Sequence, residues 1–123
     1  MDNTMIYAEL KHILSPDIAD LSSYFPDDPE SFGFSLQLLI GPKDQAGEES
    51  FQVTVCTPQW LSQHFPHDQI VIGRHYLIVF EYNLDRLINR IGLILQLYSG
   101  ETWEEVATKI SRIAYWEFED YKG

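Results

Sequence analysis

The most regular alternation of hydrophobic and polar residues in this chain lies between positions 32 and 40. Large apolar residues share one parity there, namely Phe32, Phe34, Leu36, Leu38 and Ile40. Because successive side chains of a strand point to opposite faces of a sheet, this pattern predicts a strand with one buried face. Residues 51–55 repeat the pattern after a loop that contains Pro42, Asp44 and Gly47, which predicts an antiparallel hairpin.

Two further strands are predicted on either side of this hairpin. Residues 5–14 alternate with one wetter face, and Pro16 stops the pattern. Residues 75–82 are rich in β-branched and aromatic side chains and show little alternation. Such a run is typical of a central strand that is covered on both faces.

Helix start signals appear at three places. Thr57 followed by Pro58 predicts a short helix that ends before Pro66, and Asn83 can cap a helix over residues 84–98. Thr102 and Glu105 form a Thr-x-x-Glu capping box before an apolar stripe over residues 103–114. Because most strands come first and the longer helices last, we predict an α+β fold. We expect a single domain over residues 1–123, with a mostly antiparallel sheet of about four strands and two C-terminal helices packed on one face.

Composition and charge limit the possible partners. The formal net charge is −11, with only eight lysines and arginines, and this balance disfavours direct binding to nucleic acid or to an anionic membrane. The chain has a single cysteine, no apolar run of the roughly 20 residues that cross a bilayer, and no basic start followed by an apolar signal segment. These features predict a cytoplasmic protein.

Negative charge is concentrated between Lys11 and Lys43. That stretch contains no lysine or arginine but has five carboxylates, those of Asp17, Asp20, Asp27, Asp28 and Glu30. The acids are interleaved with apolar residues that a folded loop can bury, namely Ile18, Leu21, Tyr24, Phe25 and Phe32. We interpret the segment as an ordered acidic surface for a cationic partner, with Tyr24 as an aromatic anchor. A merely solvated loop is the alternative.

A second acidic and aromatic segment lies at positions 116–121. It alternates large rings with carboxylates, in the order Trp116, Glu117, Phe118, Glu119, Asp120 and Tyr121. We predict that Trp116, Glu117, Glu119 and Asp120 join the acidic residues and Tyr24 in a binding surface. A solvated or docking strand is again the alternative.

Catalytic and metal-binding patterns are weak. His64 and His67 are three residues apart, but Pro66 between them breaks the helical geometry that would place both on one metal. Cys56 falls near a predicted strand end, where a buried inert thiol is common, and His75 beside Arg74 fits a strand entry better than an anion site. The glycines are isolated, so no phosphate loop is indicated. We therefore predict no catalytic residue, no metal, no cofactor and no enzyme activity.

Several segments resemble the bacterial immunity protein 8 family. The resemblance is carried by 32–38 with Gly41-Pro42, by 51–61 (FQVTVCTPQWL), by 73–79 (GRHYLIV), by 103–106 (WEEV) and by 116–121 (WEFEDY). It covers most of residues 8–121 in order, and Val-Cys-Thr-Pro-x-Trp-Leu and Trp-Glu-Phe-Glu are its most specific parts. Residues 91–97 and 43–47 are the least similar.

The resemblance implies a function that composition does not. Members of this family are found beside toxin genes in polymorphic toxin systems, so a protein of this kind is expected to bind and neutralise one cognate toxin domain without catalysis. Together with the acidic charge, this predicts stoichiometric inhibition of a toxin C-terminal domain with a basic surface, for which a nuclease is one candidate. The alternatives are an acidic interaction or adaptor module without a toxin partner, and a small enzyme that uses His64, His67, His75 or Cys56. The oligomeric state is not predicted.

Overall fold

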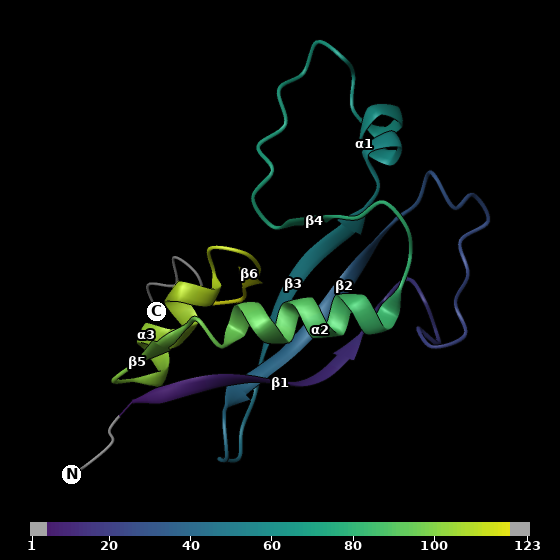
Figure 1. Cartoon of the computed structure of the whole chain (residues 1–123). Helices are drawn as coiled ribbons and strands as arrows, with labels where there is room; N and C mark the ends of the chain where they lie inside the picture. Colours follow the sequence, from purple (N-terminus) through teal and green to yellow (C-terminus); the bar gives the residue numbers. More distant parts are fainter. Residues whose placement is uncertain (1–4, 119–123) are drawn as a thin grey trace.

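The structure, a computed structural model, describes residues 5–118. Its strands are β1 (Ile6–Leu14), β2 (Gly33–Pro42), β3 (Glu49–Cys56), β4 (Tyr76–Ile78), β5 (Ser99–Gly100) and β6 (Tyr115–Trp116). Its helices are α1 (Pro58–His64), α2 (Leu84–Leu95) and α3 (Trp103–Ile110). Figure 1 shows a curled sheet with α2 lying across one face. The α+β class predicted from the sequence is confirmed.

The sheet is mixed and larger than the four mostly antiparallel strands that we predicted. Its order is β4-β3-β2-β1-β5, and β6 pairs with β3 as well. The β3–β4 pair is parallel. Helix α1 and the long loop after it carry the chain back, so that β4 runs beside residues 54–56 of β3 in the same direction. Strands β5 and β6 contain two residues each, which is too short for any alternation to be visible in the sequence.

The segment 75–82 is not the central strand that its apolar run suggested. Only Tyr76–Ile78 form a strand, and β4 lies at one end of the strand order. The side chains of Ile78 and Phe80 are 49% and 82% exposed. An apolar run without alternation predicts burial on both faces, but here one face and one edge are open.

The core lies between the alternating apolar residues of β2 and β3 and the two later helices. In the hairpin, Phe34 pairs with Val55, Leu36 with Val53 and Leu38 with Phe51, so all of these side chains face the same side. Apolar residues of α2 and α3 complete this core, namely Leu87, Ile91, Leu95, Val106, Ala107 and Ile110. The two C-terminal helices therefore contribute to one core on one face of the sheet, as predicted.

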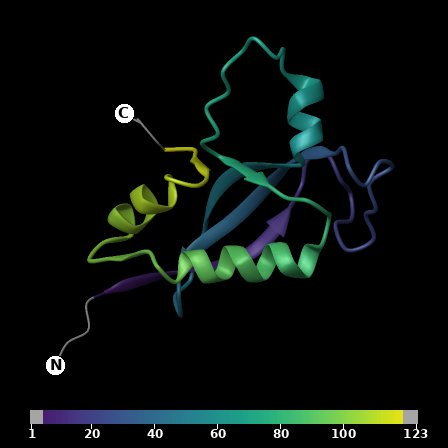
Figure 2. The same ribbon diagram turned by 45° about the horizontal axis from the view of Figure 1, so that its top comes forward.

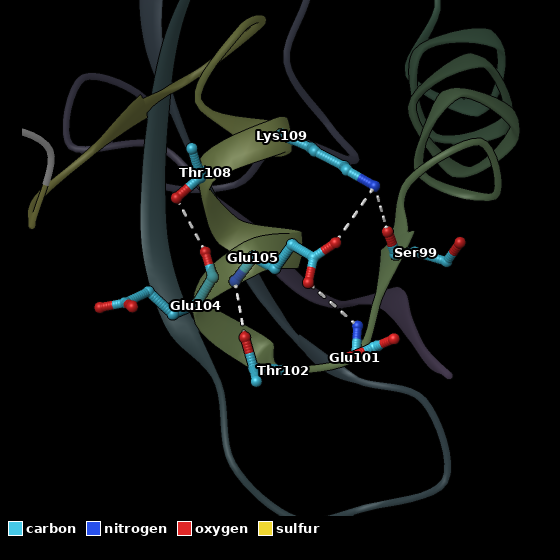
Figure 3. Close-up of polar contacts among 7 residues, drawn as sticks. All are labelled: Ser99, Glu101, Thr102, Glu104, Glu105, Thr108 and Lys109. Atoms are coloured by element: carbon cyan, nitrogen blue, oxygen red, sulfur yellow. Dashed lines mark hydrogen bonds and ion pairs between the residues drawn. The ribbon is translucent and has the colours of Figure 1, made fainter. Parts of the chain in front are cut away.

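Each predicted helix cap is present. The Oγ1 atom of Thr57 accepts from the Trp60 amide at 3.3 Å, and Asn83 Oδ1 accepts from the Arg86 amide at 2.9 Å. Thr102 Oγ1 accepts from the Glu105 amide at 3.1 Å, and the Glu105 carboxylate reaches back to the amide of Glu101 (Figure 3). These side chains satisfy amides that have no partner within their own helix.

Replacing Thr102 by alanine is expected to lower the free energy of unfolding by about 1 kcal/mol, because the Glu105 amide loses its acceptor at the start of α3. Urea titration followed by circular dichroism measures the change. Thr102→Ser keeps the hydroxyl and should stay close to the wild type. Equal destabilisation of both variants would show that the cap is not the cause.

Candidate interaction surfaces

The segment between β1 and β2, residues 15–32, is referred to below as the acidic loop. Leu21 and Phe32 are buried, and the ring of Tyr24 packs edge-on against Phe34 and Tyr82, with centroids 5.6 and 4.9 Å apart. The Tyr82 hydroxyl donates to the carbonyl of Leu21 at 2.7 Å. Burial removes water from the hydroxyl groups of Tyr24 and Tyr82 and raises the pKa of both, so they stay protonated at neutral pH. The loop is thus ordered by an apolar inner side.

Carboxylates of the acidic loop shape its turns. Asp17 Oδ2 accepts from the Ser35 amide at 2.8 Å, and Asp28 Oδ1 accepts from the Glu30 amide at 3.0 Å. Asp20 Oδ1 accepts from the amide and the hydroxyl of Ser22, at 3.0 and 2.6 Å. These bonds, with those from Ser23, hold the pKa of Asp20 below its usual value. Asp17, Asp20 and Asp28 therefore have structural roles in the loop.

All five carboxylates of the loop remain exposed to solvent, including Asp27 and Glu30. Within residues 5–118, none of them forms an ion pair with a basic side chain. Their charge is therefore not cancelled locally, and it adds to a protein whose net charge is already negative. Such a surface attracts cations and repels anions over roughly a Debye length of 8 Å at physiological salt.

The exposed aromatic ring in the acidic loop belongs to Phe25 and not to Tyr24. We grouped Phe25 with the residues that the loop can bury, but its side chain is 77% exposed. Tyr24 is half-buried because it packs on Phe34 and Tyr82. Loops have no periodicity that would assign neighbouring rings to opposite sides, so the sequence could not separate the two.

The described part of the second predicted segment, residues 116–118, begins on β6 and lies away from the acidic loop. Trp116 is only 9% exposed, and its indole stacks on Phe51 with centroids 6.2 Å apart. Glu117 is exposed, whereas Glu119 and Asp120 lie outside the described residues. Figures 1 and 2 both show the acidic loop and the C-terminal strand β6 on opposite sides of the sheet. The structure therefore does not join the two segments into one surface.

A groove of about 750 Å³ lies beside Trp116, between α3 and the start of β3. Its wall carries Glu49 and Glu104 as well as Lys109 and Arg112. In Figure 3, Lys109 donates to the carbonyl of Ser99 at 2.6 Å and lies 3.9 Å from the Glu105 carboxylate. Charges of both signs line this groove, so it has no clear preference for a charged ligand.

The candidate catalytic residues have structural partners. Cys56 is fully buried, and burial raises the pKa of its thiol to about 11, so it is protonated at neutral pH. The His64 ring stacks on the Trp60 indole with centroids 3.9 Å apart, and His67 Nε2 is hydrogen-bonded to the Ser62 hydroxyl. His75 Nε2 lies 2.9 Å from the Ser111 carbonyl, beside the C-terminus of α3.

These groups are not assembled into one site. Arg74, next to His75, also donates to the Ser111 carbonyl at 2.9 Å. Within residues 5–118, no cluster of three histidine, cysteine, aspartate or glutamate side chains has the geometry to hold a metal ion.

Across the same residues, no helix is both long and apolar enough to cross a membrane.

The structure is therefore that of a small α+β domain with an exposed acidic loop. The chain belongs to the immunity protein 8 family, whose model matches residues 8–121, and the resemblance seen in the sequence is confirmed. The match begins within β1 and spans the other five strands and all three helices. No curated protein and no solved structure matches the chain.

Proposed function

We propose that this protein is an immunity protein that binds one cognate bacterial toxin domain and neutralises it in a one-to-one complex. The observation that supports this most strongly is the family membership over residues 8–121. The acidic loop adds a plausible contact surface, because it is ordered, lacks compensating cations within the described residues and exposes the Phe25 ring.

The chemistry of the acidic loop favours a toxin with a basic surface. A nuclease is the candidate that fits best, because a cleft that binds phosphates must be cationic. Asp17, Asp20, Asp27, Asp28 and Glu30 would draw that cleft toward the loop and so keep nucleic acid out of it. Phe25 would fill an apolar site at the centre of the contact, and Tyr24, which packs on Phe34 and Tyr82, would hold the loop in place.

Trp116, Glu117, Glu119 and Asp120 belong to this proposal as a separate contact. Trp116 lies on β6 and Glu117 follows it, on the other side of the sheet from the acidic loop, so a toxin that touches both regions would have to extend around the molecule. The protein would act in the cytoplasm, where a toxin that enters a bacterial cell meets its substrate.

Co-expression with the toxin domain encoded beside this gene tests the function. Survival of the host and recovery of a one-to-one complex are the expected results. Death of the host without a complex would exclude that domain as the partner. If no neighbouring domain is toxic or bound, the protein is better explained as an acidic adaptor module.

Electrostatic capture predicts a strong effect of salt on association. Steered association reaches about 10⁸ M⁻¹s⁻¹ at low salt, against about 10⁶ M⁻¹s⁻¹ without steering. We expect the association rate with the toxin domain to fall at least about fivefold when ionic strength rises from about 0.01 to 0.15 M. Stopped-flow fluorescence measures this rate.

Two triple variants that remove the same number of charges test whether the acidic loop causes the salt dependence of the association rate. Asp27→Asn, Asp28→Asn and Glu30→Gln together remove three charges from the acidic loop, and they should flatten the salt dependence. Asp44→Asn, Glu101→Gln and Glu104→Gln remove the same number of charges from exposed sites outside the loop. Equal behaviour of the two triple variants would mean that only total charge matters, and an association rate that changes less than about twofold with salt would rule out steering.

A further inference from the structure

The β4 side of the sheet ends in an exposed edge formed by Tyr76–Ile78, and the chain bends at Phe80. The backbone carbonyl of His75 accepts from the Thr54 amide at 3.0 Å, and the backbone N–H of Val79 donates to the Cys56 carbonyl at 2.8 Å. The odd-numbered residues of this segment therefore bond to β3. Because backbone groups of successive strand residues point to opposite edges, the N–H and the C=O of Ile78 point away from β3. In the described strand order, β4 has no neighbour on that side.

A groove lies between this edge and helix α2. It has a volume of about 460 Å³ and is lined by residues 76–81 of the edge and by α2. Leu77 pairs with the core residue Val55, and on the helix side Leu87, Ile91 and Ile94 form an apolar wall. Figure 1 shows β4 and α2 as neighbouring elements. One more strand beside β4 would place its core-facing side chains against this wall.

The rim of the groove carries positive charge in a protein that has little of it. Arg86 and Arg90, two of only eight lysines and arginines in the chain, line the α2 side. Arg86 is paired with Glu81, with Nη1 and Oε1 2.8 Å apart. Arg90 forms no ion pair within residues 5–118. A partner with a carboxylate at this point would gain a charge-assisted hydrogen bond.

We propose that the edge formed by Tyr76–Ile78 accepts an extended segment of the cognate toxin as an added strand, which rests on the proposed function. The backbone of that segment would bond to the N–H and the C=O of Ile78. Alternate apolar side chains would enter the groove, and a carboxylate would face Arg90. Main-chain bonds at a sheet edge supply affinity, and the pockets beside it supply specificity.

A second copy of this chain is a poorer occupant than the toxin. Two copies each carry a net charge of −11, so they repel one another. Antiparallel pairing of two β4 edges would also bring Arg86 and Arg90 of both copies to the same small interface, where each copy supplies only the Glu81 carboxylate to offset them. The charge of the rim therefore favours a different chain.

The test compares two substitutions at Ile78 in the complex with the toxin domain. Ile78→Pro removes the outward N–H, while the Val79 bond to Cys56 on the other edge is kept. Ile78→Ala loses most of the same side chain but keeps the N–H. We expect the dissociation constant of the proline variant to exceed that of the alanine variant by at least tenfold.

Two measurements keep the test valid if the proline variant folds poorly. Hydrogen exchange on the wild type should show the Ile78 amide becoming protected when the toxin domain binds. Arg90→Glu should weaken binding at least about fivefold more than Arg112→Glu, which makes the same charge change at the end of α3.

The outcomes separate this inference from the proposed function. If the wild type does not bind or neutralise any neighbouring toxin, the proposed function fails. If it does bind, but the two Ile78 variants bind equally and the Ile78 amide gains no protection, the added strand is wrong. A wild-type dimer that Ile78→Pro converts to a monomer would also overturn it, because a second copy would then occupy the edge.

Discussion

Replacing Phe51 by alanine is expected to lower the free energy of unfolding by about 3 to 5 kcal/mol, the largest effect of a single substitution that we predict here. The Phe51 side chain is 0% exposed. It lies on β3 opposite Leu38, and its ring stacks on Trp116 with centroids 6.2 Å apart. The variant therefore loses core contacts to both β2 and β6.

Guanidinium titration followed by tryptophan fluorescence measures this loss, and the Trp116 indole reports on the same site. The neighbouring residue supplies a matched control, because Gln52 is on the same strand but is exposed on the opposite face. Gln52→Ala should change the free energy of unfolding by less than about 1 kcal/mol. A loss below about 1 kcal/mol for Phe51→Ala would mean that β6 is not anchored by this stack.

The parts of the fold that the sequence predicted are those with a local physical signal. Alternation identified β2 and β3, because one face of the hairpin is buried and the other is wet. The caps at Thr57, Asn83 and Thr102 were identified because only a short polar side chain can satisfy the first amides of a helix. Each of these signals involves residues close together in the chain.

The parts that the sequence did not predict depend on contacts between distant segments. Strand β4 is parallel to β3 and lies at the edge because of the path that the chain takes through α1 and the loop after it. Strand β6 exists because Tyr115 and Trp116 pair with Gln52 and Phe51. Neither arrangement leaves a local pattern, so both required the structure.

The candidate surface was predicted in part. The acidic loop is ordered and its carboxylates are exposed, as its mixed composition indicated. The sequence could not show that the acidic loop and strand β6 lie on opposite sides of the sheet. It also could not show that the Tyr24 ring points to the core while Phe25 points to solvent, because that depends on Phe34 and Tyr82.

Three acids of the loop have a double role that limits how they can be tested. Asp17, Asp20 and Asp28 accept backbone hydrogen bonds that shape the loop, and they also contribute charge. Alanine at these positions would change both the conformation and the charge. Asparagine keeps an oxygen acceptor and removes only the charge, so the amide substitutions isolate the electrostatic contribution.

Replacing Phe25 by alanine is expected to weaken binding to the toxin domain about 30-fold, which corresponds to about 2 kcal/mol. The ring is 77% exposed at the centre of the acidic loop, so a partner that covers it removes a large apolar area from water. Its loss should increase the dissociation rate more than it changes the association rate, because the steering charges remain. Isothermal titration calorimetry and surface plasmon resonance measure these changes.

Leu97 provides the matched control for Phe25. Its side chain is also 77% exposed, but it lies just beyond the end of α2 and outside the acidic loop. Leu97→Ala should leave the dissociation constant within about twofold, and neither variant should lose more than about 0.5 kcal/mol of stability, because exposed side chains contribute little to the core. If both variants bind the toxin domain equally well, Phe25 is not an anchor, and the apolar contact must come from another surface, for which the edge at β4 is the next candidate.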